Sequence, residues 1–106
     1  MSNHKSKSMI KLDKLAILCH QTAIRRKKIG EHSSARGIML AISAEWRELM
    51  EASMTKESGH IPEWTEMEEE AADVIIGCMT LLQHMKCESI EQLLRDKIEF
   101  NRKRED

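Results

Sequence analysis

Residues that interrupt helices are scarce in this chain, and their positions constrain its fold more than any other feature. The 106 residues include four glycines and one proline, and the clearest break combines both kinds at Ser58–Pro62. Elsewhere, apolar residues recur every three or four positions, which is the helical period. Aromatic residues make up 3% of the chain and tyrosine is absent, so residues typical of β-sandwiches and barrels are scarce. The sequence therefore predicts a single all-α domain.

Start and stop signals divide the chain into four expected helices. The first ends in the basic run Arg25–Lys28 followed by Gly30, because cations suit a helix C-terminus and glycine suits the position beyond it. Two pairs of residues have the spacing of capping boxes: Thr65 with Glu68, and Ser89 with Gln92. The expected helices cover approximately residues 9–28, 34–56, 65–85 and 89–103, after a flexible tail at residues 1–8.

Long helices with short links predict a four-helix bundle-like protomer that occupies residues 9–106 as one domain. Because so short a chain builds only a thin core, we expect it to assemble as a dimer or a dimer of dimers. The apolar positions expected to be buried are Ile10, Leu15, Ile17, Leu18, Ile24, Ile38, Ala41, Ile42, Leu49, Met50, Val74, Ile75, Cys78, Leu81, Leu82, Met85, Ile90, Leu93, Leu94 and Ile98.

The charge balance and the cysteines limit the classes of function. The chain has 17 basic and 18 acidic residues and a net charge of −1, whereas a nucleic-acid-binding protein usually has a basic excess. It has no 18-residue apolar run and its N-terminus is polar, so we expect no membrane span, no signal peptide and a cytoplasmic location. Cys19, Cys78 and Cys87 form no Cys-x-x-Cys pair, so we expect reduced, core-lining thiols and no zinc site.

Two pairs of carboxylates lie within the expected helices without basic neighbours. Glu45 and Glu48 are three residues apart in one helix, and Glu70 and Asp73 are three residues apart in the next. Side chains at this spacing share a helix face, where like charges repel unless Lys or Arg lies three or four positions away. No basic residue occupies those positions around any of the four acids. If the two helices pack face to face, four carboxylates converge.

Converging carboxylates need a cation, because uncompensated charge in a partly buried place is strongly unfavourable. Oxygen ligands alone favour Mg²⁺, or Mn²⁺, over zinc. The alternative is a solvated acidic face. Favourable interaction with the helix dipole explains the acids in the first turn of the third helix, but it does not explain the mid-helix acids Glu45 and Glu48.

The acidic motifs also resemble those of a known family. Glu45-Trp-Arg-Glu48 followed by Glu70-Ala-Ala-Asp73 resembles the ExxE…ExxD signature of the all-α NTP pyrophosphatases, which are the MazG-like proteins and their dimeric dUTPase relatives. The apolar run at 39–52, the block at 69–76 and the ending at 97–104 resemble the family's Glu-x-x-Glu-Leu, Glu-Glu-Leu-Ala-Asp-Val and Lys-x-x-Tyr-Asn-x-x-Arg segments. A single ExxE is a weak signal, whereas the ordered set is a strong one.

The resemblance implies hydrolysis of a nucleoside triphosphate between its α and β phosphates, giving the monophosphate and pyrophosphate. We expect Glu48 to orient the attacking water and to act as its general base, although the sequence does not separate its role from that of Glu45. The implied ligands of Mg²⁺, which neutralises phosphate oxygens and lowers the pKa of a bound water, are Glu45, Glu48, Glu70 and Asp73.

Basic and polar residues elsewhere are candidates for substrate binding. Lys97, Asn101 and Arg104 share one helix face and suit phosphate or sugar oxygens, the alternative being a solvated helix end. His20 and Lys28 are additional candidates, and their alternatives are a packing histidine and a simple helix end.

The chain departs from the family's pattern at two places. No aromatic residue lies between Lys28 and His32, where phage-type relatives often have one, and Ala44 stands where some relatives carry an extra acid for a third metal. Trp46 and Trp64 are further candidates to approach a base, although Trp46 adjoins the metal ligands and is expected to pack in a core or interface. The base and the sugar of the substrate therefore stay open.

Two other classes of function fit a helical bundle. A catalytically silent interaction module with a solvated acidic face would bind no metal. A di-iron carboxylate protein needs Glu-x-x-His on its helices, and the one match, Glu57–His60, is interrupted by Gly59.

Overall fold

Four helices and their connecting loops make up the protein in a computed structural model, which describes residues 11–105. The all-α prediction is therefore confirmed, while the expected tail at 1–8 and the apolar residue Ile10 lie outside the described residues. No helix in the described part of the chain is long and apolar enough to cross a membrane. The helices are α2 (Leu12–Arg25), α3 (Ala35–Glu51), α4 (Glu66–His84) and α5 (Ile90–Lys103).

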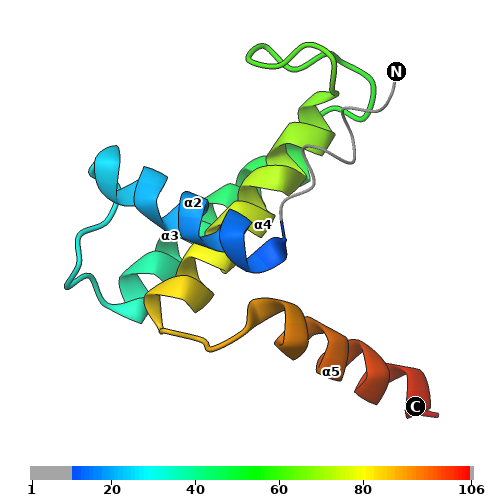
Figure 1. Cartoon of the computed structure of the whole chain (residues 1–106). Coiled ribbons are helices and arrows are strands. Elements are labelled where there is room, and N and C mark those ends of the chain that lie inside the picture. The colour runs from blue at the N-terminus through cyan, green and yellow to red at the C-terminus, as the bar shows by residue number, and fades with distance from the viewer. Residues whose placement is uncertain (1–10, 106) are drawn as a thin grey trace, which may run out of the picture.

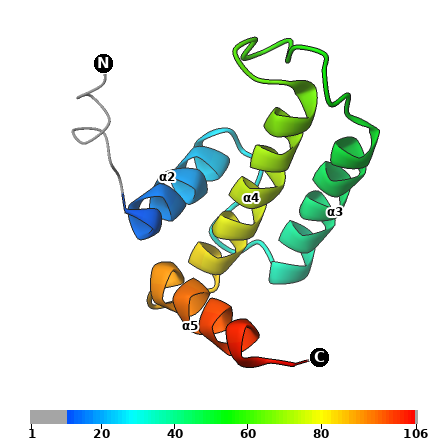
Figure 2. The same cartoon turned by 90° about the vertical axis from the view of Figure 1, so that its right-hand side faces the viewer.

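Helix α4 is the centre of a bundle-like arrangement. Figure 2 shows α2 and α3 on its two sides, with α3 antiparallel to it, and α5 crossing its lower end. Helix α5 packs on α2 and α4, and its C-terminal half extends away from the other three helices (Figure 1). In residues 11–105, α2 and α3 both pack on α4 without a close approach between their own backbones, so a groove lies between them.

The core is small, as expected for this chain length. Ala16, Met79 and Ile90 form one buried cluster where α2, α4 and α5 meet, and Ile38 is the buried apolar residue of α3. Many positions expected to be buried are instead exposed, because other helices cover only part of the surface of each helix, α4 included. These corrected positions are Leu15, Ile17, Leu18, Ala41, Met50, Ile75, Cys78, Met85, Leu93, Leu94 and Ile98. The three cysteines are free, but the exposed Cys78 does not line the core.

Helix α3 is shorter than the sequence predicts, ending at Glu51 rather than near Lys56. The following loop instead satisfies the N-terminal amides of α4: the carbonyl of Ser53 accepts a hydrogen bond from Met67, and that of Lys56 accepts one from Glu66. Those amides have no partner inside their own helix, so the loop gains hydrogen bonds that a continued α3 would forgo. All four expected helices are present, but the link between α3 and α4 is longer than the short links that the sequence predicted.

The capping box of α4 is confirmed. The Thr65 hydroxyl accepts from the Glu68 amide at 3.1 Å, and the Glu68 carboxylate accepts from the Thr65 amide at 2.9 Å. This reciprocal pair fixes where α4 begins and hence which turn carries its functional acids.

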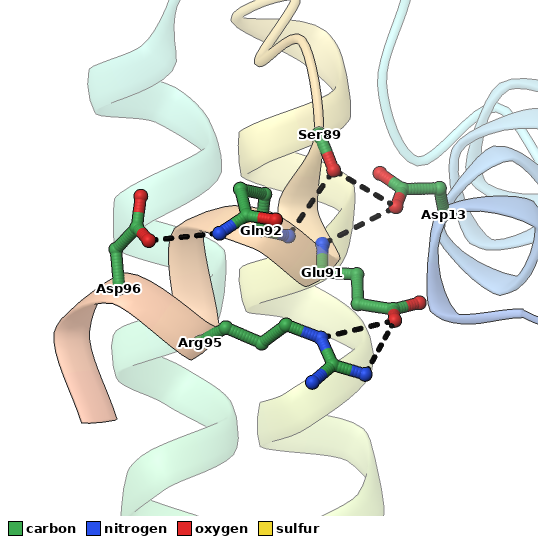
Figure 3. Close-up of polar contacts among 6 residues, drawn as sticks. All are labelled: Asp13, Ser89, Glu91, Gln92, Arg95 and Asp96. Carbon is green, nitrogen blue, oxygen red and sulfur yellow. Dashed lines mark hydrogen bonds and ion pairs between the residues drawn. The ribbon is translucent and has the colours of Figure 1, made fainter. Parts of the chain in front are cut away.

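The N-terminus of α5 is capped by a residue from another helix. Ser89 accepts from the Gln92 amide as predicted, but the Gln92 side chain bonds Asp96, so the second half of the expected capping box is absent (Figure 3). Asp13 of α2 instead accepts from the amides of Ile90 at 2.6 Å and of the next residue at 3.2 Å. A carboxylate at a helix N-terminus interacts favourably with the helix dipole as well as with the amides. Asp13 therefore fastens α5 to α2.

Replacing Asp13 by alanine is expected to destabilise the protein by about 1–3 kcal/mol, because two partly buried amides lose their acceptor. Chemical denaturation gives the stability, and amide hydrogen exchange tests whether protection is lost first in α5. Asp96→Ala is the matched control, since Asp96 bonds only an exposed side chain of its own helix, and it should cost less than about 0.5 kcal/mol. Equal losses for the two variants would contradict this role of Asp13.

Candidate metal centre

A close contact between α3 and α4 lies next to the acidic motifs. A Cβ atom at Gly77 would lie 2.9 Å from Cγ1 of Ile42, so only glycine fits without a shift of Ile42. One turn further along each antiparallel helix, Ile42 is followed by Glu45, and Gly77 is preceded by Asp73. The packing that Gly77 permits therefore sets the carboxylates of the two helices against each other.

The structure brings three of the four predicted ligands together. One carboxylate oxygen from each of Glu45, Glu70 and Asp73 lies within 4.8 Å of the other two, and all three side chains are half-buried. Two ligands on opposite sides of an octahedral Mg²⁺ lie about 4.2 Å apart, so a small rotation of the side chains gives suitable geometry. Glu48 is exposed and lies outside this group, although its charge acts on each of the other three acids.

Burial and mutual repulsion disfavour ionisation of these acids. The pKa of Glu45 is raised by desolvation and then by the charges of Asp73 and Glu48. Desolvation is also the main reason that the pKa values of Glu70 and Asp73 are raised, with further contributions from neighbouring carboxylates. Each shift favours the neutral form, so a bound cation would remove an unfavourable interaction from the site.

One carboxylate oxygen in the cluster is an unsatisfied acceptor. Oε1 of Glu70 is buried and has no hydrogen-bond partner among the described residues 11–105. A hydrogen bond to Glu48 is the smallest cause of the raised pKa of Glu70, and it would require a proton on one of the two carboxyl groups. A buried unpaired carboxylate oxygen is unfavourable. The donor set and this orphaned oxygen therefore fit a divalent cation bound by oxygen ligands.

The acids lie at one side of the groove between α2 and α3. The groove has a volume of about 450 Å³, which is within the usual size of a small-molecule site. Its walls and floor are mainly aliphatic, including Leu18, Ile38 and Ile76, and no aromatic residue lines it. The charged residues in its lining are Arg26, Lys28, Glu45 and Asp73. Such a groove suits a ligand that combines an apolar body with an anionic group.

A tight turn at the end of α2 places the two cations. The amide of Lys28 donates to the carbonyl of Ala23, the amide of Lys27 donates to that of Ile24, and Lys27 has a φ of 61°. These bonds define a Schellman motif, whose left-handed position usually holds glycine. Gly30, which the sequence suggested as the stop signal, does not have a positive φ, so lysine occupies the strained position here.

The cations on this turn interact with the acidic cluster. Lys28 lowers the pKa of Glu45, and Arg26 lowers that of Asp73, although burial outweighs both effects. Lys28 is therefore placed in the groove, as one of the predicted substrate-binding residues. Arg26 belongs to the basic run Arg25–Lys28, for which an ordinary helix end was the favoured interpretation and phosphate binding the alternative.

The predicted stripe on α5 does not reach this groove within one chain. Lys97, Asn101 and Arg104 are exposed and do not line it. Lys97 Nζ lies 4.7 Å from the centre of the Phe100 ring, and Arg104 Cζ lies 5.8 Å from it. Both cations thus pack on an aromatic face of their own helix.

His20 has a packing environment rather than a place in the groove lining. Nε2 of His84 donates to the carbonyl of Ser33 at 2.6 Å, which leaves Nδ1 of His84 to accept from Nε2 of His20 at 2.9 Å. The pKa of His20 is lowered by burial and by His84. Trp46 and Trp64 are both about half exposed and do not line the groove, and Trp46 is not part of the core within this chain.

Comparisons with family models, with characterised proteins and with solved structures find no match to the chain. The functional interpretation therefore depends on the residues and their geometry.

Gly77→Ala is expected to lower stability by about 1 kcal/mol, because the crowding penalty of about 1–3 kcal/mol exceeds the helix-propensity gain of about 1 kcal/mol. In an Ile42→Ala background the same substitution should become stabilising, since the obstructing side chain is gone. A double-mutant cycle measured by chemical denaturation tests this reversal of sign. If Gly77→Ala has the same effect in both backgrounds, the close contact is not what requires glycine.

Without metal, Asp73→Asn is expected to raise the melting temperature at neutral pH, since the variant has no charge to bury or to repel Glu48 and Glu69. Because the pKa of Asp73 is raised in the folded state, ionisation of Asp73 destabilises the fold at pH values above that pKa. This destabilisation is absent at pH values below the pKa of Asp73 in the unfolded state. Lowering the pH from about 7.5 to about 4 should therefore shrink the difference between variant and wild type.

Millimolar Mg²⁺ should then raise the melting temperature of the wild type more than that of Asp73→Asn. A variant that is less stable than the wild type at neutral pH without metal would show that the cluster is not electrostatically strained.

Proposed function

We propose that the protein is a Mg²⁺-dependent nucleoside triphosphate pyrophosphohydrolase that releases a nucleoside monophosphate and pyrophosphate. The observation that supports this most is the group formed by Glu45, Glu70 and Asp73, three half-buried carboxylates from two helices with an unsatisfied oxygen. The groove beside it combines aliphatic walls with two cations. The resemblance to the MazG-like NTP pyrophosphatases implies metal binding by these three acids and by Glu48.

The roles of the residues follow from their positions. Glu45, Glu70 and Asp73 would hold Mg²⁺, or Mn²⁺, which would neutralise phosphate charge and lower the pKa of the attacking water. The exposed Glu48 accepts the proton of the water that attacks the α-phosphorus, while the bond to the bridging oxygen breaks and pyrophosphate leaves. Arg26 and Lys28 bind phosphate oxygens from the groove.

The groove also suits the nucleoside. The groove is large enough for a base and a sugar, and its aliphatic lining provides no aromatic ring for stacking. Selection among bases would therefore rest on shape and on a few polar groups, which agrees with a role in clearing unwanted nucleotides from the cellular pool.

Self-association is part of the proposal. Large apolar side chains are exposed on α3, including Leu40 at 69% and Met50 at 61%, and the buried core is small. A homodimer or homotetramer would cover such surfaces and would allow the stripe of Lys97, Asn101 and Arg104 to reach the groove of another copy. The three free cysteines favour a cytoplasmic location.

Pyrophosphate release from a panel of nucleoside triphosphates with Mg²⁺ tests the activity. Glu48→Gln and Asp73→Asn should each reduce turnover by about 100-fold or more, with folding preserved. Glu51→Gln, an exposed acid in the last turn of α3, is the matched control and should keep wild-type turnover. Undiminished turnover in either site variant would contradict the assignment.

The competing proposal is a catalytically silent interaction module. The exposed apolar surface of α3 favours it, whereas the buried, unpaired oxygen of Glu70 does not. Such a module would release no pyrophosphate and would gain no thermal stability from Mg²⁺ or Mn²⁺.

A further inference from the structure

The loop between α3 and α4, at residues 52–65, is held by a buried serine. Ser58 is 2% exposed, its amide donates to the carbonyl of Trp64 at 2.8 Å, and its hydroxyl donates to Oε1 of Glu69 in α4. The same hydroxyl oxygen accepts from the amides of His60 at 3.1 Å and Ile61 at 3.0 Å. The proton of this hydroxyl therefore fastens the loop to α4, while its two lone pairs accept hydrogen bonds within the loop.

This arrangement also orients the imidazole of His60, on which the charges of the expected ligands Asp73 and Glu70 act. Nδ1 of His60 donates to Oε2 of Glu69 at 2.9 Å, and Glu69 directly precedes the expected ligand Glu70. The two oxygens of Glu69 thus bond Ser58 and His60, and together they fix the orientation of the ring. The His60 side chain is 86% exposed, so the ring presents its other edge to solvent.

The charges that face His60 are acidic. Its pKa is raised, first by the hydrogen bond and charge of Glu69 and then by the charges of Asp73 and Glu70. Conversely, His60 lowers the pKa of Asp73. Basic groups therefore act on the acidic centre from two sides. His60 lies on the side of the loop, and Arg26 and Lys28 lie at the end of α2. Once a divalent ion neutralises the carboxylates, an exposed imidazolium at its edge suits an anion.

We propose that His60 binds the pyrophosphate end of the metal-bound substrate, with Glu69 and Ser58 as positioning residues. Pairing with Glu69 does not by itself account for His60, because Glu69 already accepts a hydrogen bond from the Ser58 hydroxyl. The imidazole of His60 is also exposed to solvent and not buried against Glu69. The choice of the pyrophosphate end rests on the proposed function, whereas binding of a polyphosphate anion depends only on the geometry. Binding of the anion and release of pyrophosphate from a nucleotide are measured separately.

Calorimetric binding of inorganic pyrophosphate in the presence of Mg²⁺ tests the proposal without any turnover. His60→Ala should weaken binding about tenfold or more, the loss expected for one charge-assisted hydrogen bond. The matched control is His32→Ala, because His32 is an exposed histidine in the α2–α3 loop. Its binding should equal that of the wild type. Circular dichroism confirms that each variant folds.

A pH series tests the positioning role of Glu69. Affinity for pyrophosphate should fall as the imidazolium of the wild type loses its proton. In Glu69→Gln this fall should begin at lower pH, because the carboxylate that raises the pKa of His60 is gone. A merely structural role for Glu69 would change affinity without moving the profile.

The results separate this inference from the proposed function. No pyrophosphate binding by the wild type, or equal binding by His60→Ala and wild type, overturns the role of His60. Pyrophosphate binding that depends on His60, without release of pyrophosphate from any nucleoside triphosphate, instead overturns the hydrolase proposal and leaves a polyphosphate-binding site.

Discussion

The close packing of α3 on α4 is the constraint on which the site depends. Without a Cβ atom at position 77, Ile42 of α3 approaches the backbone of α4, and the two helices keep a fixed antiparallel register. That register places Glu45 opposite Asp73 and brings Glu70 within reach of both. A larger residue at position 77 would separate the helices at the turn next to the carboxylates, so stability and metal geometry share one contact.

The acidic centre works against the stability of a small domain. Among residues 11–105 only four apolar side chains are buried, yet three half-buried carboxylates face one another with raised pKa values. Other interactions compensate, notably the capping of α5 by Asp13 and the loop fastened through Ser58. Functional sites commonly retain such unfavourable charge because a ligand relieves it.

The sequence predicted the local parts of the fold and site well. Helix type, the capping box of Thr65 and the shared faces of the acidic pairs depend on residues three or four positions apart, which a linear pattern reveals. The acidic pairs also predicted that Glu45, Glu48, Glu70 and Asp73 converge if the two helices pack face to face, and three of these four acids lie together, without Glu48.

The parts that sequence reasoning missed depend on tertiary contacts. Nothing in the local pattern indicates that Asp13 caps a helix that begins 77 residues later, or that Arg26 faces an acid of α4. His60 lay in a segment expected to be an ordinary loop, and its position follows from hydrogen bonds of Ser58 to α4. Burial was overestimated because the period of a helix shows which residues share a face, but not whether another helix covers it.

The central claim is that carboxylates from α3 and α4 form one divalent-metal site. Anomalous diffraction from crystals soaked in millimolar Mn²⁺ locates the ion directly. We predict a manganese peak coordinated by oxygens of Glu45, Glu70 and Asp73, with Glu48 at its edge. A peak elsewhere, or no peak between the two helices, would contradict the claim.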